Sequence, residues 1–280
     1  MLGFLNQLAA TDGPHISLRA EPIFTIGDIV VTNSIIYGLV VAFAMLALGV
    51  VAARRAGIKP AGILTTGFEM ALEFIVNMLE GILGSRQKAV KYAPIFGTFF
   101  IFIVLNNVAG LLPIVGTGIT VGGSPIFRPF TADLNGTIAM SVIAILTIQY
   151  LSIKESGFLG HLKHYFTDKP LNPINLFIGI LEVFGELTRV ASLSLRLFLN
   201  TAVGEILIAV FAFVGAYGAS FTLLPIMLFE VLVALIQGYV FTVLCATYLG
   251  LAIHHGEEHE AEATSDHPDS PKLSSEGASA

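Results

Sequence analysis

The feature that most constrains this chain is a series of long stretches that contain no charged residue. They occupy residues 29–53, 92–127, 134–153, 206–229 and 231–253. An α-helix rises about 1.5 Å per residue, so about 20 apolar residues are enough to cross a hydrocarbon layer of about 30 Å. We therefore expect an all-α polytopic membrane protein with at least five membrane-embedded helices.

The composition excludes the main alternatives to a membrane protein. Hydrophobic residues make up 55% of the 280 residues and charged residues only 12%, with a mean hydropathy of +0.82. This is about half the charge of a soluble domain, and the chain is too apolar for disorder. The net charge of −6 comes without a basic stripe, which argues against a nucleic-acid partner. The single cysteine, Cys245, excludes a disulfide framework and a cysteine metal cluster.

The uncharged stretches predict one membrane domain over residues 28–255. Its spans are expected at about 29–53, 94–115, 134–153, 173–214 and 221–255. Residues 1–27 are expected to form an external N-terminal segment, because Met1 to Ala10 lacks the basic residues of a cleaved signal.

Residues 62–86 show a different pattern from the predicted spans. Glu69, Glu73 and Asn77 recur at helical spacing, and Ile75 and Leu79 occupy the opposite side. This predicts one amphipathic helix that lies at the membrane surface or against a partner. A packing helix without a separate function is the favoured interpretation, and the surface role stays open.

The basic residues predict the orientation of the chain. They concentrate between the first and second spans and again after the third, whereas loop 116–133 carries only Arg128. By the positive-inside rule the two basic loops are cytoplasmic, the N-terminus is outside and the C-terminus is cytoplasmic. Residues 256–280 hold seven acids and one base, Lys272, and are expected to form a disordered acidic tail.

The segment 173–214 is too long for an upright span. As one helix it would reach about 63 Å, so it must tilt by about 60° or break, whereas membrane helices usually tilt by about 0–40°. The segment 221–255 also exceeds an upright span. We therefore expect the last two helices to form a long, steeply tilted hairpin.

Both long segments carry polar residues on one face. At 100° per residue the first stripe falls within about 80° of the helix circumference, and it comprises Glu182, Glu186, Arg189, Arg196 and Asn200. Glu205 lies about 140° from Glu182 and is expected to face elsewhere. A second stripe comprises Glu230, Gln237, Tyr248 and His255. Ionisable residues inside a membrane cost about 2.5–3.5 kcal/mol each, so facing stripes indicate an ion or substrate path.

The charges of the first stripe have different expected partners. Glu186 and Arg189 are three residues apart and could simply neutralise each other. Arg196 has no acid three or four positions away, and a guanidinium does not lose its proton. Its counter-charge is therefore expected from another helix or another chain.

At these residues the sequence resembles a known family. The run Ser192-Leu-Ser-Leu-Arg196-Leu-Phe-Leu-Asn200, followed by Gly204-Glu205, is similar to the signature of subunit a of F-type ATP synthases. The resemblance runs in order from Asn106 to Tyr248. Further matches are Asn107 with Leu111 to Pro113, Ala132 to Asn135, Asn172 to Asn175, and Gln237 within residues 234–241. The chain departs from the family at Gly110, where some members carry an aspartate, and at Val190, where some carry a proline.

The resemblance implies a non-catalytic, proton-translocating stator subunit with an essential arginine at Arg196. That arginine would face the carboxylates of a rotating c-subunit ring and separate two offset half-channels. The outer half-channel would use Asn200, Glu205, Glu230 and Gln237, and the cytoplasmic one Glu182 with Ser192. Glu186 has no counterpart in the family pattern, so its role and that of Arg189 stay open. Because Gly110 replaces an acid, proton access must rely on the other groups.

The resemblance also implies the partners and the location. The partners would be the c-ring, b-type peripheral stalk subunits, the soluble ATPase sector and membrane lipid, in a bacterial plasma (inner) membrane. No cofactor and no metal are expected, although His254, His255 and His259 leave a minor possibility of metal binding. The chain contains no Walker motif, so ATP chemistry belongs to partner chains.

Three other classes of protein remain as alternatives. A secondary ion-coupled transporter would also have charges at mid-membrane, but such transporters usually show internal repeats with broken helices, and no convincing repeat is present. A purely structural membrane scaffold would tolerate the loss of Arg196. An integral-membrane hydrolase is the weakest alternative.

Overall fold

The structure is a computed structural model that describes residues 20–55, 62–112, 120–121, 124–125, 127–165, 173–214 and 219–265. The helices of this part of the chain are α2 (Asn33–Arg55), α3 (Ile63–Leu83), α4 (Arg86–Gly110), α5 (Leu134–Tyr165), α6 (Pro173–Val214) and α7 (Ala219–Ser265). A short 3-10 helix, η1 (Phe130–Ala132), precedes α5. The strands are β1 (Pro22–Ile26), β2 (Ile29–Thr32), β3 (Thr120–Val121) and β4 (Ser124–Pro125).

The all-α polytopic fold is confirmed. Five of the described helices are long and apolar enough to cross a membrane, within Asn33–Arg55, Arg86–Gly110, Leu134–Glu155, Gly179–Ile208 and Leu224–Ile253. The strands add two small antiparallel hairpins, β1 with β2 and β3 with β4.

The start of the first span differs from the expectation. Residues 29–32 were expected inside the span, but they form β2 and pair with β1, with Ile26 opposite Ile29. Gly27 makes the turn with a φ of 62°, a conformation that favours glycine. The helix therefore begins only at Asn33. A stretch without charged residues shows which part of a chain is compatible with lipid. Over only four residues it does not distinguish a strand from a helix.

Other helix ends also differ from the expected spans. α4 begins at Arg86 instead of residue 94 and carries Pro94 inside it, and α5 continues to Tyr165 beyond the expected end at 153. α7 continues to Ser265, so residues 256–265 are helical where a disordered tail was expected. Apolar runs locate the lipid-compatible part of a helix, and a helix can continue into water on either side. Residues 1–19 of the N-terminal segment and 266–280 of the tail lie outside the described residues.

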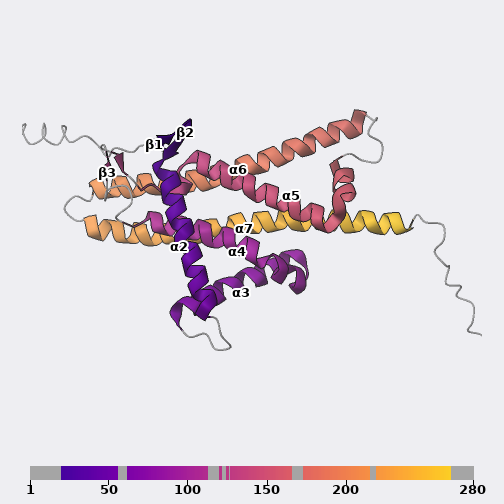
Figure 1. The fold of residues 1–280 in the computed structure, drawn as a ribbon, viewed down its shortest axis with the longest axis horizontal. Coiled ribbons are helices and arrows are strands. Elements are labelled where there is room, and N and C mark those ends of the chain that lie inside the picture. Colours follow the sequence, from indigo (N-terminus) through magenta and orange to yellow (C-terminus); the bar gives the residue numbers. More distant parts are fainter. Residues whose placement is uncertain are drawn as a thin grey trace, which may run out of the picture.

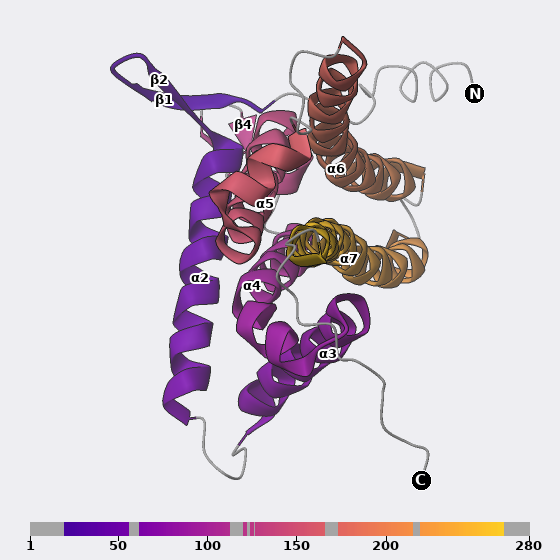
Figure 2. The same cartoon turned by 90° about the vertical axis from the view of Figure 1, so that its right-hand side faces the viewer.

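The helix α7 occupies the centre of the fold. It packs against α3, α4, α5 and α6, and Figure 2 shows it nearly end-on among them. α6 and α7 run lengthwise through the molecule and α2 crosses their direction steeply (Figure 1). The two long helices are therefore far from parallel to α2, and their steep tilt in a membrane stays a prediction.

The core is apolar and joins five helices. Its fully buried members come from α3 to α7 and include Ile75, Leu79, Phe96, Ile103, Ala144, Leu193, Leu197, Phe241 and Leu249. In α3 the buried residues lie on one side and Glu69, Glu73 and Asn77 are exposed on the other, which confirms the amphipathic helix. The helix ends at Gly84, whose left-handed conformation (φ 68°) lets its N–H reach the Glu80 carbonyl at 2.9 Å.

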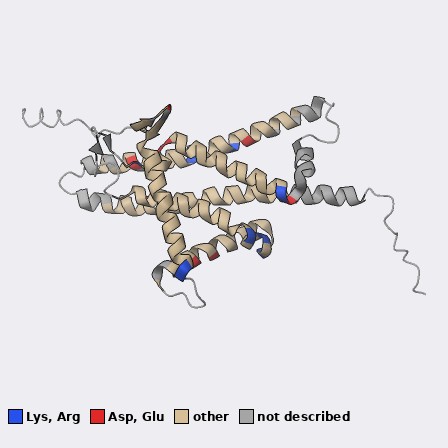
Figure 3. Cartoon of the chain, in the orientation of Figure 1, with Lys and Arg blue, Asp and Glu red and all other residues tan. Residues whose placement is uncertain are grey.

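The outer surface of the helices is also apolar. Large side chains such as Phe43, Leu46, Leu187 and Leu228 are more than half exposed. Figure 3 shows that charged residues are sparse along the described helices. Such a surface is stable against lipid or against apolar partner helices, but it would associate in water.

A short segment before α5 packs against three helices, α2, α4 and α5. The Phe130 ring lies between Gly38 of α2 and Gly136 of α5, where a Cβ would come within 2.8 Å and 3.0 Å of ring atoms. Thr131 donates a hydrogen bond of 2.6 Å to the Asn107 side-chain oxygen on α4. This segment therefore has a fixed place beside the functional site described below.

The packing of α7 against α4 can be tested at Gly238. A Cβ there would lie 2.7 Å from Val104 Cγ2 and 3.4 Å from the Phe100 carbonyl, so Gly238→Ala forces the two helices apart. We expect a loss of about 1–3 kcal/mol of stability, measured as a lower thermal unfolding midpoint of the protein in detergent.

The matched control is Gly67→Ala in α3, where an added Cβ meets nothing within 4 Å. That variant should keep or raise the midpoint, because alanine favours a helix by up to about 1 kcal/mol. Equal midpoints for the two variants would contradict the close packing at Gly238.

Candidate functional site

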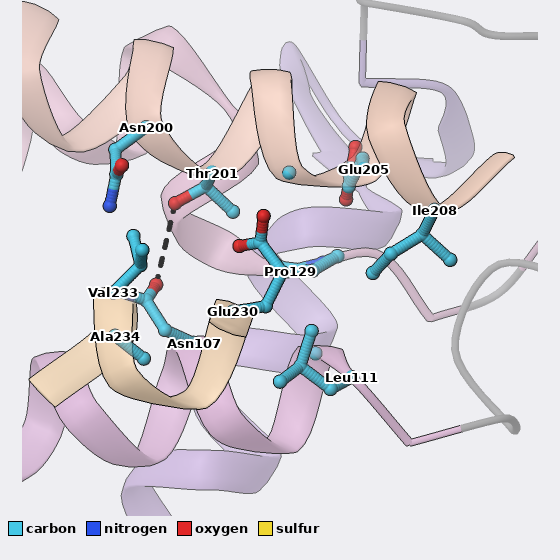
Figure 4. A pocket seen from close by; sticks show the side chains of 12 residues that line it. Asn107, Leu111, Pro129, Asn200, Thr201, Glu205, Ile208, Glu230, Val233 and Ala234 are labelled. Carbon is cyan, nitrogen blue, oxygen red and sulfur yellow. Dashed lines mark hydrogen bonds between the residues drawn. The ribbon is translucent and has the colours of Figure 1, made fainter. Parts of the chain in front are cut away.

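A small cavity with several polar side chains in its lining lies where α4, α6 and α7 meet the segment before α5. Its volume is about 40 Å³, which is enough for one or two water molecules. Figure 4 shows side chains of α6 and α7 facing each other across it. It is lined by Asn107, Gly110, Leu111, Pro129, Asn200, Thr201, Gly204, Glu205, Ile208, Glu230, Val233 and Ala234.

The carboxyl group of Glu230 is placed by a glycine on the facing helix. A Cβ on Gly204 would lie 2.5 Å from Glu230 Oε2, so the missing side chain provides the room that the carboxyl group occupies. Glu230 is only 9% exposed, and the described residues offer it no ion-pair partner. Its carboxyl group therefore faces the cavity without a fixed counter-charge.

Glu205 lies on the same cavity but has a cation near it. Its Oε2 is 3.9 Å from Nη2 of Arg128, and the two side chains are 33% and 7% exposed. The expectation that Glu205 faces away from the polar stripe is therefore wrong. The cavity covers an arc of α6 from Asn200 through Gly204 to Glu205, and this arc is wide because glycine leaves the middle of it open.

Asn107 connects three of the surrounding elements. Its side-chain oxygen accepts hydrogen bonds from Thr131 at 2.6 Å and from Thr201 of α6 at 3.4 Å, the second of which is drawn in Figure 4. Its Nδ2 is buried and has no hydrogen-bond partner within the described part of the chain. A donor of this kind beside a cavity is suited to binding water.

Gly110 lines the cavity where some members of the resembled family carry an acid. A Cβ at this position would lie 2.8 Å from Cγ of Pro129. An aspartate side chain would therefore collide with Pro129 in this chain. The acids that line the cavity are Glu205 and Glu230.

Arg196 lies outside the cavity, on the exposed face of α6. The neighbouring Leu193 and Leu197 are buried, whereas Leu195 and Leu199 are exposed beside it. No described acid forms an ion pair with Arg196. Its cation therefore lies one turn from the cavity residue Asn200, on an apolar surface, and lacks a counter-charge from the described residues.

Glu186 and Arg189 form an ion pair with each other on α6. The Arg189 guanidinium also lies over the ring of Tyr248 on α7, 4.7 Å from its centroid. The interpretation that these two charges neutralise each other is confirmed. The cation–π contact additionally ties the two long helices together, by about 0.5–2 kcal/mol.

The remaining predicted residues lie apart from the cavity. Ser192 is exposed on α6, one turn before Arg196, and Gln237 is buried on α7, two turns after Glu230. Gln237 Nε2 has no hydrogen-bond partner among the described residues. Glu182 belongs to α6, and its side chain is outside the described part of the structure.

A second hollow is larger. It measures about 910 Å³ and lies between α2, α3 and α4, and its lining combines apolar residues such as Leu46 and Val50 with Glu69, Glu73 and Arg86. It contains none of the predicted site residues. The small cavity between α6 and α7 is therefore the better candidate site.

Sequence reasoning missed Thr201, which lines the cavity, and Arg128, which lies beside the cavity residue Glu205. Thr201 lies on α6 beside Asn200, but hydroxyl residues are too common in membrane helices to stand out. Arg128 was counted only as the single charge of its loop, and that isolation was the available signal. Both become recognisable once the loop is placed against α6.

The fold and site define a class of protein. They describe a multi-pass membrane protein whose two longest helices border a small cavity with polar side chains and, among the described residues, carry one exposed arginine. Comparison with known proteins is specific: residues 35–250 match the family model described as ATP synthase A chain. The chain belongs to the ATP synthase subunit a family.

Individual relatives agree with the family match. The chain is 31% identical over 261 residues to "ATP synthase subunit a" of Gloeobacter violaceus, covering 92% of this chain and 97% of that protein. It is 32% identical to the protein of the same name from Moorella thermoacetica, over 85% and 98% of the two chains. The Xanthobacter autotrophicus protein is 35% identical over 67% and 74%. The bacterial relatives and the five apolar helices support a multi-pass protein of a bacterial inner membrane.

The contact between Gly204 and Glu230 gives a test of the site. In Gly204→Ala the new Cβ would overlap the Glu230 carboxyl group, which is the flexible end of a side chain and can turn away. We expect the protein to assemble normally, and ATP-driven proton pumping in membrane vesicles to fall roughly tenfold, as a misplaced proton carrier would cause.

Gly185→Ala on the same helix is the matched control, because an added Cβ there meets nothing within 4 Å. It should pump at the normal rate. Normal pumping by Gly204→Ala as well would show that the position of the Glu230 carboxyl group is unimportant.

Proposed function

We propose that this chain is the stator subunit that conducts protons to and from the c-ring of a rotary F-type ATP synthase. The observation that carries the proposal is the placement of Arg196. This guanidinium is exposed on an apolar face of α6, has no ion-pair partner among the described residues and lies beside the polar cavity. Because it cannot shed its charge, it requires an anion from another chain.

The proposed anion is the membrane-buried carboxylate of a c subunit. A carboxylate that comes close to Arg196 is stabilised in its ionised form and releases its proton. The same carboxylate must be neutral before it moves into lipid, because a bare charge there costs several kcal/mol. Arg196 therefore acts both as a trigger for proton release and as a barrier between the two sides.

The small cavity is proposed as part of the outer half-channel. Asn200, Glu205 and Glu230 line it, and Gln237 follows Glu230 on α7. The two carboxyl groups can relay protons, and the buried Nδ2 of Asn107 can hold a water between them. Arg196 lies about one helical turn from Asn200, at the inner end of this path.

The cytoplasmic half-channel is proposed to begin on the other side of Arg196. Ser192 is exposed one turn before Arg196 on the same helix. Glu182 lies almost three turns before Ser192. The Glu186 to Arg189 pair lies between them and is bound to Tyr248. We assign this pair to holding α6 against α7, because each charge already has its partner.

The orientation and partners follow from the same proposal. The N-terminus is outside, the C-terminus is in the cytoplasm, and the membrane potential supplies about 2.3 kcal/mol per proton for each 100 mV. The partners are the c-ring, the b-type peripheral stalk subunits, the soluble ATPase sector and lipid. This chain contributes no nucleotide site, so the chemistry of ATP takes place on partner chains. The family match removes the reason to prefer a secondary transporter, a scaffold or a hydrolase.

Replacement of Arg196 is the direct test of the proposal. Arg196→Ala should abolish ATP-driven proton pumping in inverted membrane vesicles, because the ring carboxylate then has no cation to release its proton against. Arg54→Ala, which removes an exposed arginine at the end of α2, should pump normally. Pumping at the normal rate by Arg196→Ala would refute the proposed mechanism.

Replacement of Glu230 tests the outer half-channel. Glu230→Gln keeps the size of the side chain but cannot exchange a proton, so coupled transport should slow by about 10²–10⁴-fold while the complex still assembles. Asp28→Asn in the exposed turn between β1 and β2 is the control for loss of an acid. Unchanged transport in Glu230→Gln would reduce this residue to a structural role.

A further inference from the structure

Among the described residues, Arg128 is the buried cation that lies beside the cavity residue Glu205. It is 6% exposed, and its Nη2 donates a hydrogen bond of 3.2 Å to the Ala132 carbonyl and lies 3.9 Å from Glu205 Oε2. Its Nε is buried without a partner within the described part of the chain. Arg128 comes from the loop before α5, far in sequence from the α6 residues that line the cavity.

The position of Arg128 is built into the fold. The next residue, Pro129, packs on Gly110 at the end of α4, and Phe130 lies between Gly38 and Gly136. Thr131 hydrogen-bonds Asn107, which itself lines the cavity. Three consecutive residues thus attach this loop to α2, α4 and α5, so the guanidinium is held at one place beside α6.

The two acids of the cavity therefore have different electrostatic surroundings. Glu205 faces a buried guanidinium that is always charged, whereas Glu230 faces Gly204 and has no cation within ion-pair distance among the described residues. Charges interact more strongly in an apolar interior than in water. The fixed charge of Arg128 is therefore an attractive partner for an anionic carboxylate at position 205, and position 230 has no such partner among the described residues.

We propose that Arg128 is a positioning residue of the outer half-channel: it holds the Glu205 carboxylate toward the cavity and stabilises the anion that forms each time Glu205 passes on a proton. This rests on the proposed function. Glu230, without such a cation, takes up the proton and carries it in neutral form. The asymmetry between the two acids comes from a loop residue and not from α6 or α7.

The first experiment removes the charge of Arg128. Arg128→Gln and Arg128→Lys are compared in vesicles stripped of the soluble sector, as passive proton flux per assembled complex. We expect Arg128→Gln to lower the flux about tenfold, and Arg128→Lys, which keeps the charge, to retain most of it. Arg54→Gln, at the exposed end of α2, should leave the flux unchanged. Normal flux in Arg128→Gln, or an equal loss in Arg128→Lys, would overturn the proposal.

A double-variant comparison separates the charge effect from damage to the fold. In the Glu205→Gln background Arg128 has lost its anionic partner, so adding Arg128→Gln should change the flux by roughly twofold or less. If the loss is again about tenfold, Arg128 acts through the structure of the loop and the proposal is wrong.

A labelling experiment leaves Arg128 in place, so it also serves if Arg128 variants fail to assemble. Thiols are introduced by Glu205→Cys or, as the matched control, by Glu230→Cys, and are treated with anionic and cationic thiol reagents of similar size. The native Cys245 is fully buried and should stay unlabelled. We expect the anionic reagent to be favoured at position 205 relative to position 230, because a fixed cation attracts it. Equal preferences would overturn the proposal.

These outcomes are distinguishable from failure of the proposed function. If Arg196→Ala still pumps, the proton-conducting mechanism itself is wrong. If Arg196→Ala is inactive while Arg128→Gln conducts normally, only the role of Arg128 is refuted.

Discussion

Compensation of charge inside an apolar helix pair is the constraint on which this structure depends. The described ionisable groups between α6 and its neighbours differ in how far this constraint is met. Arg189 is neutralised by Glu186 and covered by Tyr248, and Glu205 is paired at long range with Arg128. Among the described residues Arg196 and Glu230 have no ion-pair partner: Glu230 faces the cavity, and Arg196 lies on an apolar surface. Arg196 is therefore available to an anion from a partner chain.

The second requirement is close approach between helices, and glycine supplies it. Gly204 lets the Glu230 carboxyl group lie against the backbone of α6, and Gly238 brings α7 against Val104 of α4. Gly110 has no side chain either, and this leaves room for the ring of Pro129. The consequence is a cavity of only about 40 Å³ whose lining includes a few polar groups. A narrow path of this kind suits protons, which move between neighbouring groups.

Residues 127–133 show how a loop completes a site that the helices alone would leave unfinished. The loop contributes Pro129 to the lining, Thr131 to the hydrogen bonds of Asn107 and Arg128 to the charge of Glu205. This explains why the candidate site was only partly predictable. The stripe on residues 182–200 and the acids at 205 and 230 follow from helical periodicity and family resemblance. The role of Arg128 depends on where a loop folds back, which has no periodic pattern in the sequence.

The wheel projection failed for Glu205 for a related reason. It gives the angle of a residue around its own helix, and it contains no information on how wide a neighbouring cavity is. Because Gly204 is open and Glu230 projects into that opening, one cavity reaches both Asn200 and Glu205. The predicted helix ends were wrong at Arg86 and Ser265. Hydropathy identifies only the apolar part of a helix, whereas backbone hydrogen bonds can continue the helix beyond that part.

The sequence by itself determined that the chain is an all-α membrane protein with five apolar spans, that residues 173–214 are too long to stand upright, and that Arg196 needs a counter-charge from elsewhere. These properties depend on composition, length and periodicity along one helix. Only the tertiary structure decided which acids share a cavity, that Arg189 of α6 lies over the Tyr248 ring of α7, and that Arg128 reaches Glu205. Those facts depend on distances between segments that are far apart in the chain, and such distances are set by packing.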